Sequence, residues 1–408
     1  MEELQISRGS SSASNCADET PRCTTSSMAT DGATPRGLID LPADVVGLKI
    51  LYHLTLAHEI AKTAPTCRLL GNAARIALLA RPFSGAVVRL KFGEKEGGDW
   101  DMCCVAATSD GRVVTCSVHG FVRFWRDGVM TSSIDTVSIC GSQGYDDVPM
   151  AVLLPGDERF VLHEHKQVNI LNFDGSIYRT FEPMQSRVTC GASMPDGVHF
   201  VLGYSSGRVR IYDVNETLVH TFAHGKEVMD VTVSLDGQHI ISGSRDTFVN
   251  VWSVPSLSHV SLCEGHTDDI RAVAVMPDGQ RILSGSYDGD VRVWLINGTH
   301  ENTFSELHTA GVISLLALPD NKHAISGSHD KTAKLFNVND GVVLRTFKNP
   351  WAYLHAEALR NTTLGRFMTD ENCMAGWMVC LALLPDGRRF VCGSSDETAI
   401  VFEHGLAL

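Results

Sequence analysis

From residue 84 to the end of the chain, short apolar runs alternate with polar segments that contain Asp-Gly, Asp-Asn or similar turns. Three stretches align with one another along their length: 227–254, 269–296 and 311–338. Each stretch has an apolar run, a turn that tolerates positive φ, a second run ending in Ser-Gly-Ser, and a third that alternates toward an aromatic residue. The pattern predicts a repeated unit of β-strands.

The spacing of the turns gives the number of units. Gly237, Gly279 and Asn321 are 42 residues apart in each step, and comparable turns occur at Gly111, Gly156-Asp157, Gly197 and Gly387. A repeat of about this length is typical of a four-stranded propeller blade. One such sheet cannot bury both of its faces alone, so neighbouring sheets must pack around a ring. We therefore predict an all-β, seven-bladed propeller over residues 84–408.

Polar side chains recur at fixed places in three units. A His precedes the first strand, a Ser lies on the second, an Asp follows in the next turn, and an aromatic residue ends the third, with His and Asp always 22 residues apart. This pattern resembles the WD40 family, and the resemblance implies a hydrogen-bonded tetrad that braces each blade. The implied sets are His224, Ser242, Asp246 and Trp252; His266, Ser284, Asp288 and Trp294; and His308, Ser326, Asp330 and Phe336.

The ends of the propeller segment carry three further features. The last unit keeps Asp396 and Phe402 but has Cys392 in place of Ser, and too few residues follow it to supply a fourth strand. We expect the run 86–92 to pair with its third strand and close the ring. The second unit lacks the His, the Asp and the Trp. An insertion at 348–377 interrupts the regular spacing.

The face that carries the Asp-bearing turns is the candidate partner-binding face. Arg245, Tyr287 and His329 each precede a turn Asp, and the insertion contributes Trp351 and Trp377. Arginine and large aromatic residues are favoured at the centres of protein interfaces. The alternative for the insertion is a flap whose aromatic residues pack on the propeller.

Residues 38–83 have helical rather than strand periodicity and predict a small helical module. The residues Leu41, Pro42, Val45, Ile50, Leu51 and Leu54 resemble an F-box, although Pro65 and the absence of a Trp near the end depart from that pattern. The resemblance implies docking to the Skp-type adaptor of a cullin ubiquitin ligase. The alternative is a helical cap on the propeller. Residues 1–37 are rich in Ser and Thr and predict a disordered tail.

Composition excludes several functions. A net charge of −13 argues against a nucleic-acid binder, which needs a basic face. No apolar run has the length of a membrane span. The 12 cysteines include no Cys-x-x-Cys pair, and several lie in apolar strand patterns, which favours free thiols in a reducing cytoplasmic or nuclear compartment. We expect no cofactor and no metal.

A recurring His–Ser–Asp set invites comparison with a nucleophilic triad, but its occurrence in three units favours bracing over catalysis. The sequence therefore predicts a binding scaffold and not an enzyme. Two functional hypotheses follow: the substrate receptor of a Skp–cullin–F-box ligase, with the adaptor and an unknown substrate as partners, or a general WD40 scaffold in signalling, trafficking or chromatin.

Overall fold

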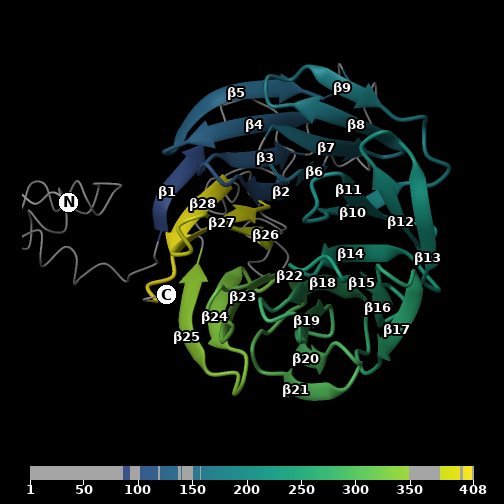
Figure 1. The fold of residues 1–408 in the computed structure, drawn as a ribbon. Helices are drawn as coiled ribbons and strands as arrows, with labels where there is room; N and C mark the ends of the chain where they lie inside the picture. The colour runs from purple at the N-terminus through teal and green to yellow at the C-terminus, as the bar shows by residue number, and fades with distance from the viewer. Residues whose placement is uncertain are drawn as a thin grey trace, which may run out of the picture. The chain divides into compact units, whose positions relative to one another are not determined.

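The computed structural model describes residues 86–91, 102–117, 120–136, 139, 150–156, 158–348, 377–395 and 398–406, with the backbone alone for 86–91, 102 and 103. These ranges contain seven antiparallel sheets of four strands each, arranged around a ring (Figure 1). The ring contacts run from each blade to the next and from the seventh back to the first. The tail 1–37, the helical module 38–83 and most of the insertion lie outside the described residues.

The first three blades follow in chain order. Blade 1 has β2 (Met102–Ala107), β3 (Val113–Ser117), β4 (Phe121–Arg126) and β5 (Val129–Asp135). Blade 2 has β6 (Met150–Leu153), β7 (Arg159–Glu164), β8 (Gln167–Asn172) and β9 (Ile177–Thr180). Blade 3 has β10 (Val188–Ser193), β11 (His199–Tyr204), β12 (Arg208–Asp213) and β13 (Leu218–Ala223).

The next three blades are the most regular. Blade 4 has β14 (Val228–Val233), β15 (His239–Ser244), β16 (Val249–Ser253) and β17 (Ser258–Cys263). Blade 5 has β18 (Ile270–Val275), β19 (Arg281–Ser286), β20 (Val291–Leu295) and β21 (His300–Phe304). Blade 6 has β22 (Val312–Ala317), β23 (His323–Ser328), β24 (Thr332–Asn337) and β25 (Val343–Lys348).

Blade 7 draws its strands from both ends of the described chain. It contains β26 (Met378–Leu383), β27 (Arg389–Ser394), β28 (Thr398–Glu403) and, as its outer strand, β1 (Ala86–Lys91). Strand β1 pairs antiparallel with β28, with Arg89 opposite Ile400. A strand that precedes blade 1 therefore completes blade 7 and covers what would be an open edge.

The core lies between neighbouring blades. The first strand of each blade is nearest the ring axis and the fourth is outermost (Figure 1). The second strands are buried along nearly their whole length, because both faces of the sheet meet a neighbouring blade. The middle Gly of Ser-Gly-Ser fits this contact: a Cβ on Gly243 would lie 2.6 Å from Ile270 of blade 5, and one on Gly285 would lie 2.6 Å from Val312 of blade 6.

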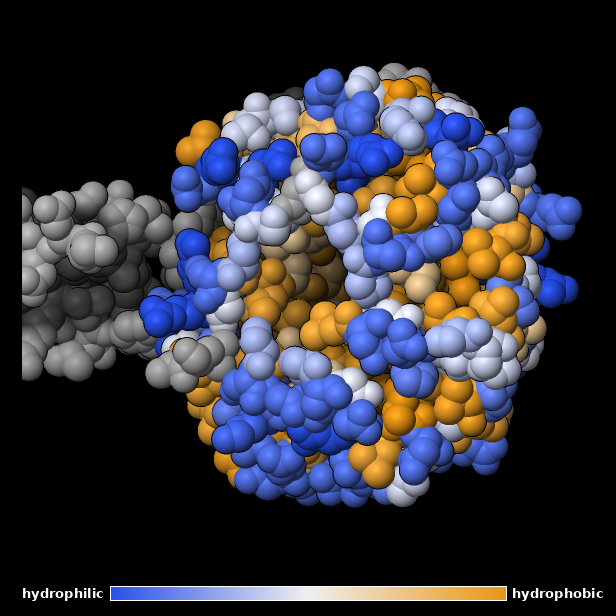
Figure 2. All heavy atoms as spheres, in the orientation of Figure 1, coloured by the Kyte–Doolittle hydropathy of each residue, from blue (hydrophilic) through white to orange (hydrophobic). Residues whose placement is uncertain are grey.

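Figure 2 shows one face of the ring, hollowed at its centre, with polar and apolar residues interspersed around the hollow. Within the described ranges, no helix combines the length and apolar character needed to cross a membrane.

Candidate functional site

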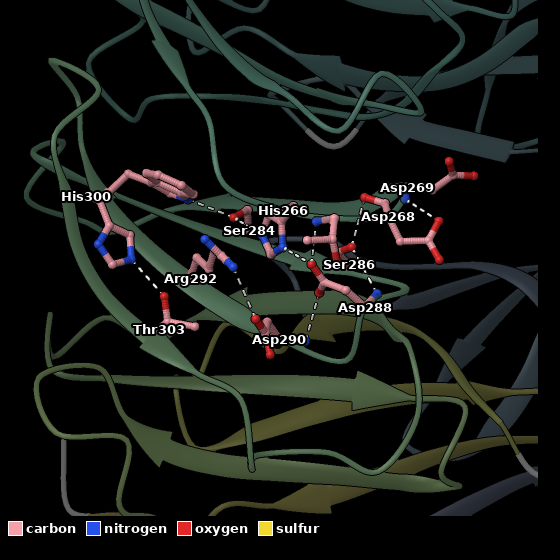
Figure 3. Close-up of polar contacts among 12 residues, drawn as sticks. His266, Asp268, Asp269, Ser284, Ser286, Asp288, Asp290, Arg292, His300 and Thr303 are labelled. Carbon is pink, nitrogen blue, oxygen red and sulfur yellow. Dashed lines mark hydrogen bonds and ion pairs between the residues drawn. The ribbon is translucent and has the colours of Figure 1, made fainter.

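The side chains of the blade 5 tetrad form a continuous chain of hydrogen bonds. Trp294 Nε1 donates to Ser284 Oγ at 2.8 Å, Ser284 Oγ lies 2.8 Å from His266 Nε2, and His266 Nδ1 lies 2.8 Å from Asp288 Oδ2 (Figure 3). The Ser284 hydroxyl thus accepts from the indole and also bonds the imidazole, whose other ring nitrogen bonds the Asp288 carboxylate. The imidazole of His266 thus links the buried end of the blade to the turn that carries Asp288.

Blades 4 and 6 repeat this arrangement. His224 lies 2.7 Å from Ser242 Oγ and 3.0 Å from Asp246, and His308 makes the corresponding contacts at 2.7 and 2.8 Å. Trp252 donates its indole N–H to Ser242 at 2.8 Å. In blade 6 the aromatic position holds Phe336, which has no N–H to donate, so that set ends at its serine.

The turn carboxylates are strong acceptors. Burial raises the pKa of the Asp288 carboxyl, but hydrogen bonds from His266 and from the backbone N–H groups of Thr267 and Asp290 outweigh it and bring the pKa to about 2. The pKa of Asp330 is likewise about 2, with burial opposed by hydrogen bonds from His308 and its neighbours. Both carboxylates are therefore ionised at neutral pH and hold the turn and the preceding loop together.

Blade 1 contains a shortened form of the network that the sequence analysis did not include. Trp125 Nε1 donates to Thr115 Oγ1 at 2.9 Å, and both side chains are buried. Thr115 and Trp125 are 10 positions apart, as Ser242 and Trp252 are in blade 4. The same spacing, with Thr accepted in place of Ser, identifies this pair in the sequence.

The second serine of Ser-Gly-Ser supports the turn from another side. Ser286 Oγ accepts from the backbone N–H of Asp288 at 3.1 Å and donates to the carbonyl of Asp268 at 3.0 Å. Figure 3 shows these contacts beside the tetrad. Together they fix the Asp-bearing turn against the loop that enters the first strand. We call the side of the ring formed by these turns and loops the upper face.

On the upper face, the residue before each turn is fixed by its backbone to the start of the first strand of its own blade. The N–H of Arg245 donates to the carbonyl of Glu227 at 2.9 Å, and the bonds from Ser205 to Arg187, Tyr287 to Asp269, His329 to Gly311 and Ser395 to Trp377 are equivalent. Blades 3, 4, 5 and 7 therefore each present two side chains at matching places, and blade 6 presents one, because its second position is Gly311.

These side chains form an ion-pair chain across blades 3, 4 and 5. Arg187 Nη2 lies 2.6 Å from Glu227 Oε1, and Arg245 Nε lies 3.3 Å from Glu227 Oε2 and 3.2 Å from Asp269 Oδ2. The arginine side chains are 40% and 47% exposed, so the energy of these pairs is moderated by solvent. Their geometric effect is to orient the arginines over the blade boundaries.

An aromatic chain continues across blades 5, 6 and 7. The Arg271 guanidinium lies 4.7 Å from the centre of the Tyr287 ring, the Tyr287 and His329 rings are 5.3 Å apart, and His329 stacks on Trp377 with centroids 3.9 Å apart. Burial and the nearby Arg271 charge both lower the pKa of His329, which keeps it neutral at pH 7. We call Tyr287, His329 and Trp377 the aromatic shelf.

The model of the "WD domain, G-beta repeat" family matches residues 216–253, 257–294 and 298–337. These segments contain the aromatic ends of all three tetrads. These three segments are WD40 repeats within a seven-bladed propeller. The matched segments begin just before the outer strand of one blade and end in the third strand of the next, which is the same offset that places β1 in blade 7. A WD40 propeller of this kind is a protein-interaction scaffold.

Several curated proteins share part of the sequence. Cilia- and flagella-associated protein 52 is 26% identical over 182 residues in Bos taurus and over 185 residues in Homo sapiens, which is 44% and 45% of this chain but only 26% and 27% of those proteins. The Xenopus laevis "tRNA (guanine-N(7)-)-methyltransferase non-catalytic subunit wdr4" is 31% identical over 134 residues, covering 31% of this chain and 34% of that protein. The similarity thus spans about a third or less of each relative's length.

The WD40 structure brings four of the predicted partner-binding residues onto one face: Arg245 in the ion-pair chain, and Tyr287, His329 and Trp377 in the aromatic shelf. Trp351 and the predicted adaptor-binding residues lie outside the described residues, as does Asp396. Cys392 and Phe402 are buried at the positions of the blade 7 tetrad. Sequence reasoning missed Arg187 and Glu227, although both occupy the repeat positions of Asp269 and Trp377.

The described residues hold no group of three His, Cys, Asp or Glu side chains placed to bind a metal ion. His163 is fully buried on β7, and desolvation lowers its pKa to about 4, so it is neutral.

Proposed function

We propose that the upper face of this WD40 propeller binds a protein partner through the ion-pair chain and the aromatic shelf. The observation that carries the proposal is the continuity of this surface: matched positions of blades 3 to 7 place arginine, tyrosine, histidine and tryptophan in one connected band. Arginine and aromatic residues that are held in place lose little conformational entropy on binding, which suits them to an interface.

The scaffold role agrees with the character of the relatives. One is named for association with cilia and flagella, and the other is named as a non-catalytic subunit. Since each shares only a segment with this chain, their partners are not transferred to it. For the compartment we propose cytosol or nucleus, with a ciliary location as the alternative that the first relative suggests. Imaging the tagged chain in ciliated cells distinguishes them.

Quantitative co-purification tests the binding face. The upper-face variant combines Arg245→Ala, Tyr287→Ala and His329→Ala. The matched control combines Gln280→Ala, Lys322→Ala and Arg388→Ala, which follow the turns between first and second strands and therefore lie on the opposite face. We expect a set of proteins that is lost from the upper-face variant and retained by the control. Identical sets from both variants would exclude the upper face.

We further propose that residues 38–83 dock an Skp-type adaptor, which would make the chain a ligase substrate receptor. This second proposal rests on the sequence pattern between Leu41 and Leu54, which lies outside the described residues. Its test is a pull-down with purified adaptor, comparing the intact chain with the triple variant Leu41→Ala, Ile50→Ala and Leu54→Ala. Binding that the variant loses supports the receptor role, and no binding by the intact chain leaves a general scaffold.

A further inference from the structure

Arg271 differs from the other arginines of the upper face. It lies on β18, and its Nη1 contacts Met229 Sδ at 3.9 Å while its guanidinium covers the Tyr287 ring. Arg187 and Arg245 each have a carboxylate within 3.3 Å, whereas no carboxylate among the described residues forms an ion pair with Arg271. A guanidinium has five N–H donors, so most of those on Arg271 remain available to a ligand.

The carboxylates nearest to Arg271 are occupied elsewhere. Asp269, two residues away, pairs with Arg245 at 3.2 Å. Asp230 of blade 4 accepts hydrogen bonds from the backbone N–H of Val231 and from that of Val273, both at 2.8 Å. Burial raises the pKa of Asp230 to about 7, although these hydrogen bonds and the Arg271 charge act to lower it. Asp230 therefore carries only a partial negative charge at neutral pH. The positive charge at Arg271 is therefore incompletely balanced.

The aromatic shelf borders this charge on one side. Tyr287, His329 and Trp377 are all partly exposed, and they run from blade 5 to blade 7 without a charged side chain among them. A cationic centre beside a rigid aromatic surface suits a ligand with an anionic group and a neighbouring apolar group. Arg271 lies on blade 5, and His329 and Trp377 lie on blades 6 and 7. The distance between them therefore determines how far apart the anionic and the apolar group of a ligand must be.

We propose that Arg271 and the aromatic shelf bind an acidic segment of a partner protein, with an Asp or Glu carboxylate on the Arg271 guanidinium and an adjacent apolar side chain against His329 and Trp377. This inference rests on the proposed upper-face function and specifies its ligand. A carboxylate fits better than a phosphate because one unpaired guanidinium balances a single negative charge, whereas phosphate recognition uses arginine clusters. The net charge of −13 further disfavours polyanions.

Selection with a phage-displayed library of random linear peptides, using the intact chain as bait, tests the inference. We expect the selected peptides to be enriched in Asp or Glu next to an apolar residue. One selected peptide is then synthesised and titrated against the intact chain and its variants. Arg271→Gln should weaken its binding by about 10- to 100-fold, the loss that follows from one hydrogen bond to a charged group. Arg271→Lys keeps the charge and should recover part of the affinity.

Arg388→Gln is the matched control, since it removes an exposed arginine from the opposite face. It should leave peptide binding unchanged, and thermal unfolding of all variants shows whether they remain folded. Replacing the selected acidic residue of the peptide, Glu by Gln or Asp by Asn, should lower the affinity as much as Arg271→Gln does. Combining the peptide change with Arg271→Gln should lower the affinity little more than either change alone. A phosphoserine peptide that binds more tightly than the Glu peptide overturns the carboxylate assignment.

The remaining outcomes separate this inference from the proposed function. Peptides that bind the upper face without acidic residues, and that are lost on Tyr287→Ala but not on Arg271→Gln, overturn the acidic ligand and keep the binding face. Peptides whose binding is insensitive to both Tyr287→Ala and Arg271→Gln overturn the two together.

Discussion

The hydroxyl of Ser284 is the central atom of the blade 5 tetrad, and its removal by Ser284→Ala has a cost that the structure specifies. Ser284 is fully buried, and its Oγ is the partner of both the Trp294 indole N–H and His266 Nε2, each at 2.8 Å. Alanine fits the same space but leaves both groups without a partner. A buried polar group that loses its hydrogen bond costs about 1–3 kcal/mol, so the two together cost about 4 kcal/mol of unfolding free energy.

Blade 6 supplies a natural comparison. Ser326 is equally buried and contacts His308 Nε2 at 2.7 Å, but Phe336 replaces the tryptophan, and the other contact of the hydroxyl, to the Lys334 carbonyl, is long at 3.5 Å. Ser326→Ala therefore leaves one orphaned group and should cost about 2 kcal/mol. The difference between the two variants measures the tryptophan hydrogen bond.

Urea unfolding followed by far-UV circular dichroism measures both variants without depending on tryptophan fluorescence. Trp294→Phe provides an internal check, because it gives blade 5 the composition of blade 6. In that background Ser284→Ala should cost only about 2 kcal/mol, giving a coupling of about 2 kcal/mol between Ser284 and Trp294. Equal losses for Ser284→Ala and Ser326→Ala, or additive effects of the two blade 5 changes, would refute the bracing role assigned to the indole N–H.

Three further predictions follow from the carboxylates and the ring closure. The pKa of Asp288 is about 2 in the folded chain against an ordinary value of 3.8, so its contribution to stability is present above about pH 4 and disappears as the pH falls toward 2; urea unfolding should show Asp288→Asn losing its stability deficit over that window. Asp230 has the opposite sign: its pKa is raised from 3.8 to about 7, so wild-type stability falls as the pH rises through that range, and Asp230→Asn should flatten the profile measured between about pH 5 and pH 8. Arg89→Pro with Leu90→Pro removes adjacent backbone donors of β1, whose N–H groups point alternately to either side, and should uncouple β1 from β28 and increase hydrogen exchange in β28; unchanged exchange would contradict the closure.

The regular blades were predictable because several signals coincide in them. The constant spacing from His224, His266 and His308 to their aspartates identifies three tetrads in the sequence, and their side chains meet in the structure. Counting strands required an outer strand for blade 7 from elsewhere in the chain, and β1 pairs with β28. Both arguments depend on repetition, which makes a local pattern specific.

The departures from the repeat were not predictable by that reasoning. In blade 3 the place of Ser242 is taken by Leu202, and Tyr212 stands opposite Phe200 as Trp252 stands opposite Ile240. The Tyr212 hydroxyl lies 3.4 Å from the Tyr204 hydroxyl and 3.7 Å from Met184 Sδ, so contacts of larger side chains replace the serine hydrogen bond in this blade. In the sequence, no polar residue at the repeat spacing indicates that this blade lacks the serine. The ion pair between Arg187 and Glu227 joins residues 40 positions apart, and only the ring geometry brings them together.

Within each repeat, the tetrad residues keep equivalent contacts, whereas the neighbouring positions on the upper face vary in side chain. The turn aspartates have equivalent histidine partners in blades 4, 5 and 6. The residues immediately before them differ, being Arg245, Tyr287 and His329. The backbone N–H of each preceding residue is held to its own blade, so its side chain can change without disturbing the tetrad. Because neighbouring blades present these variable side chains side by side, the proposed binding surface extends over several blades while the contacts inside each blade stay constant.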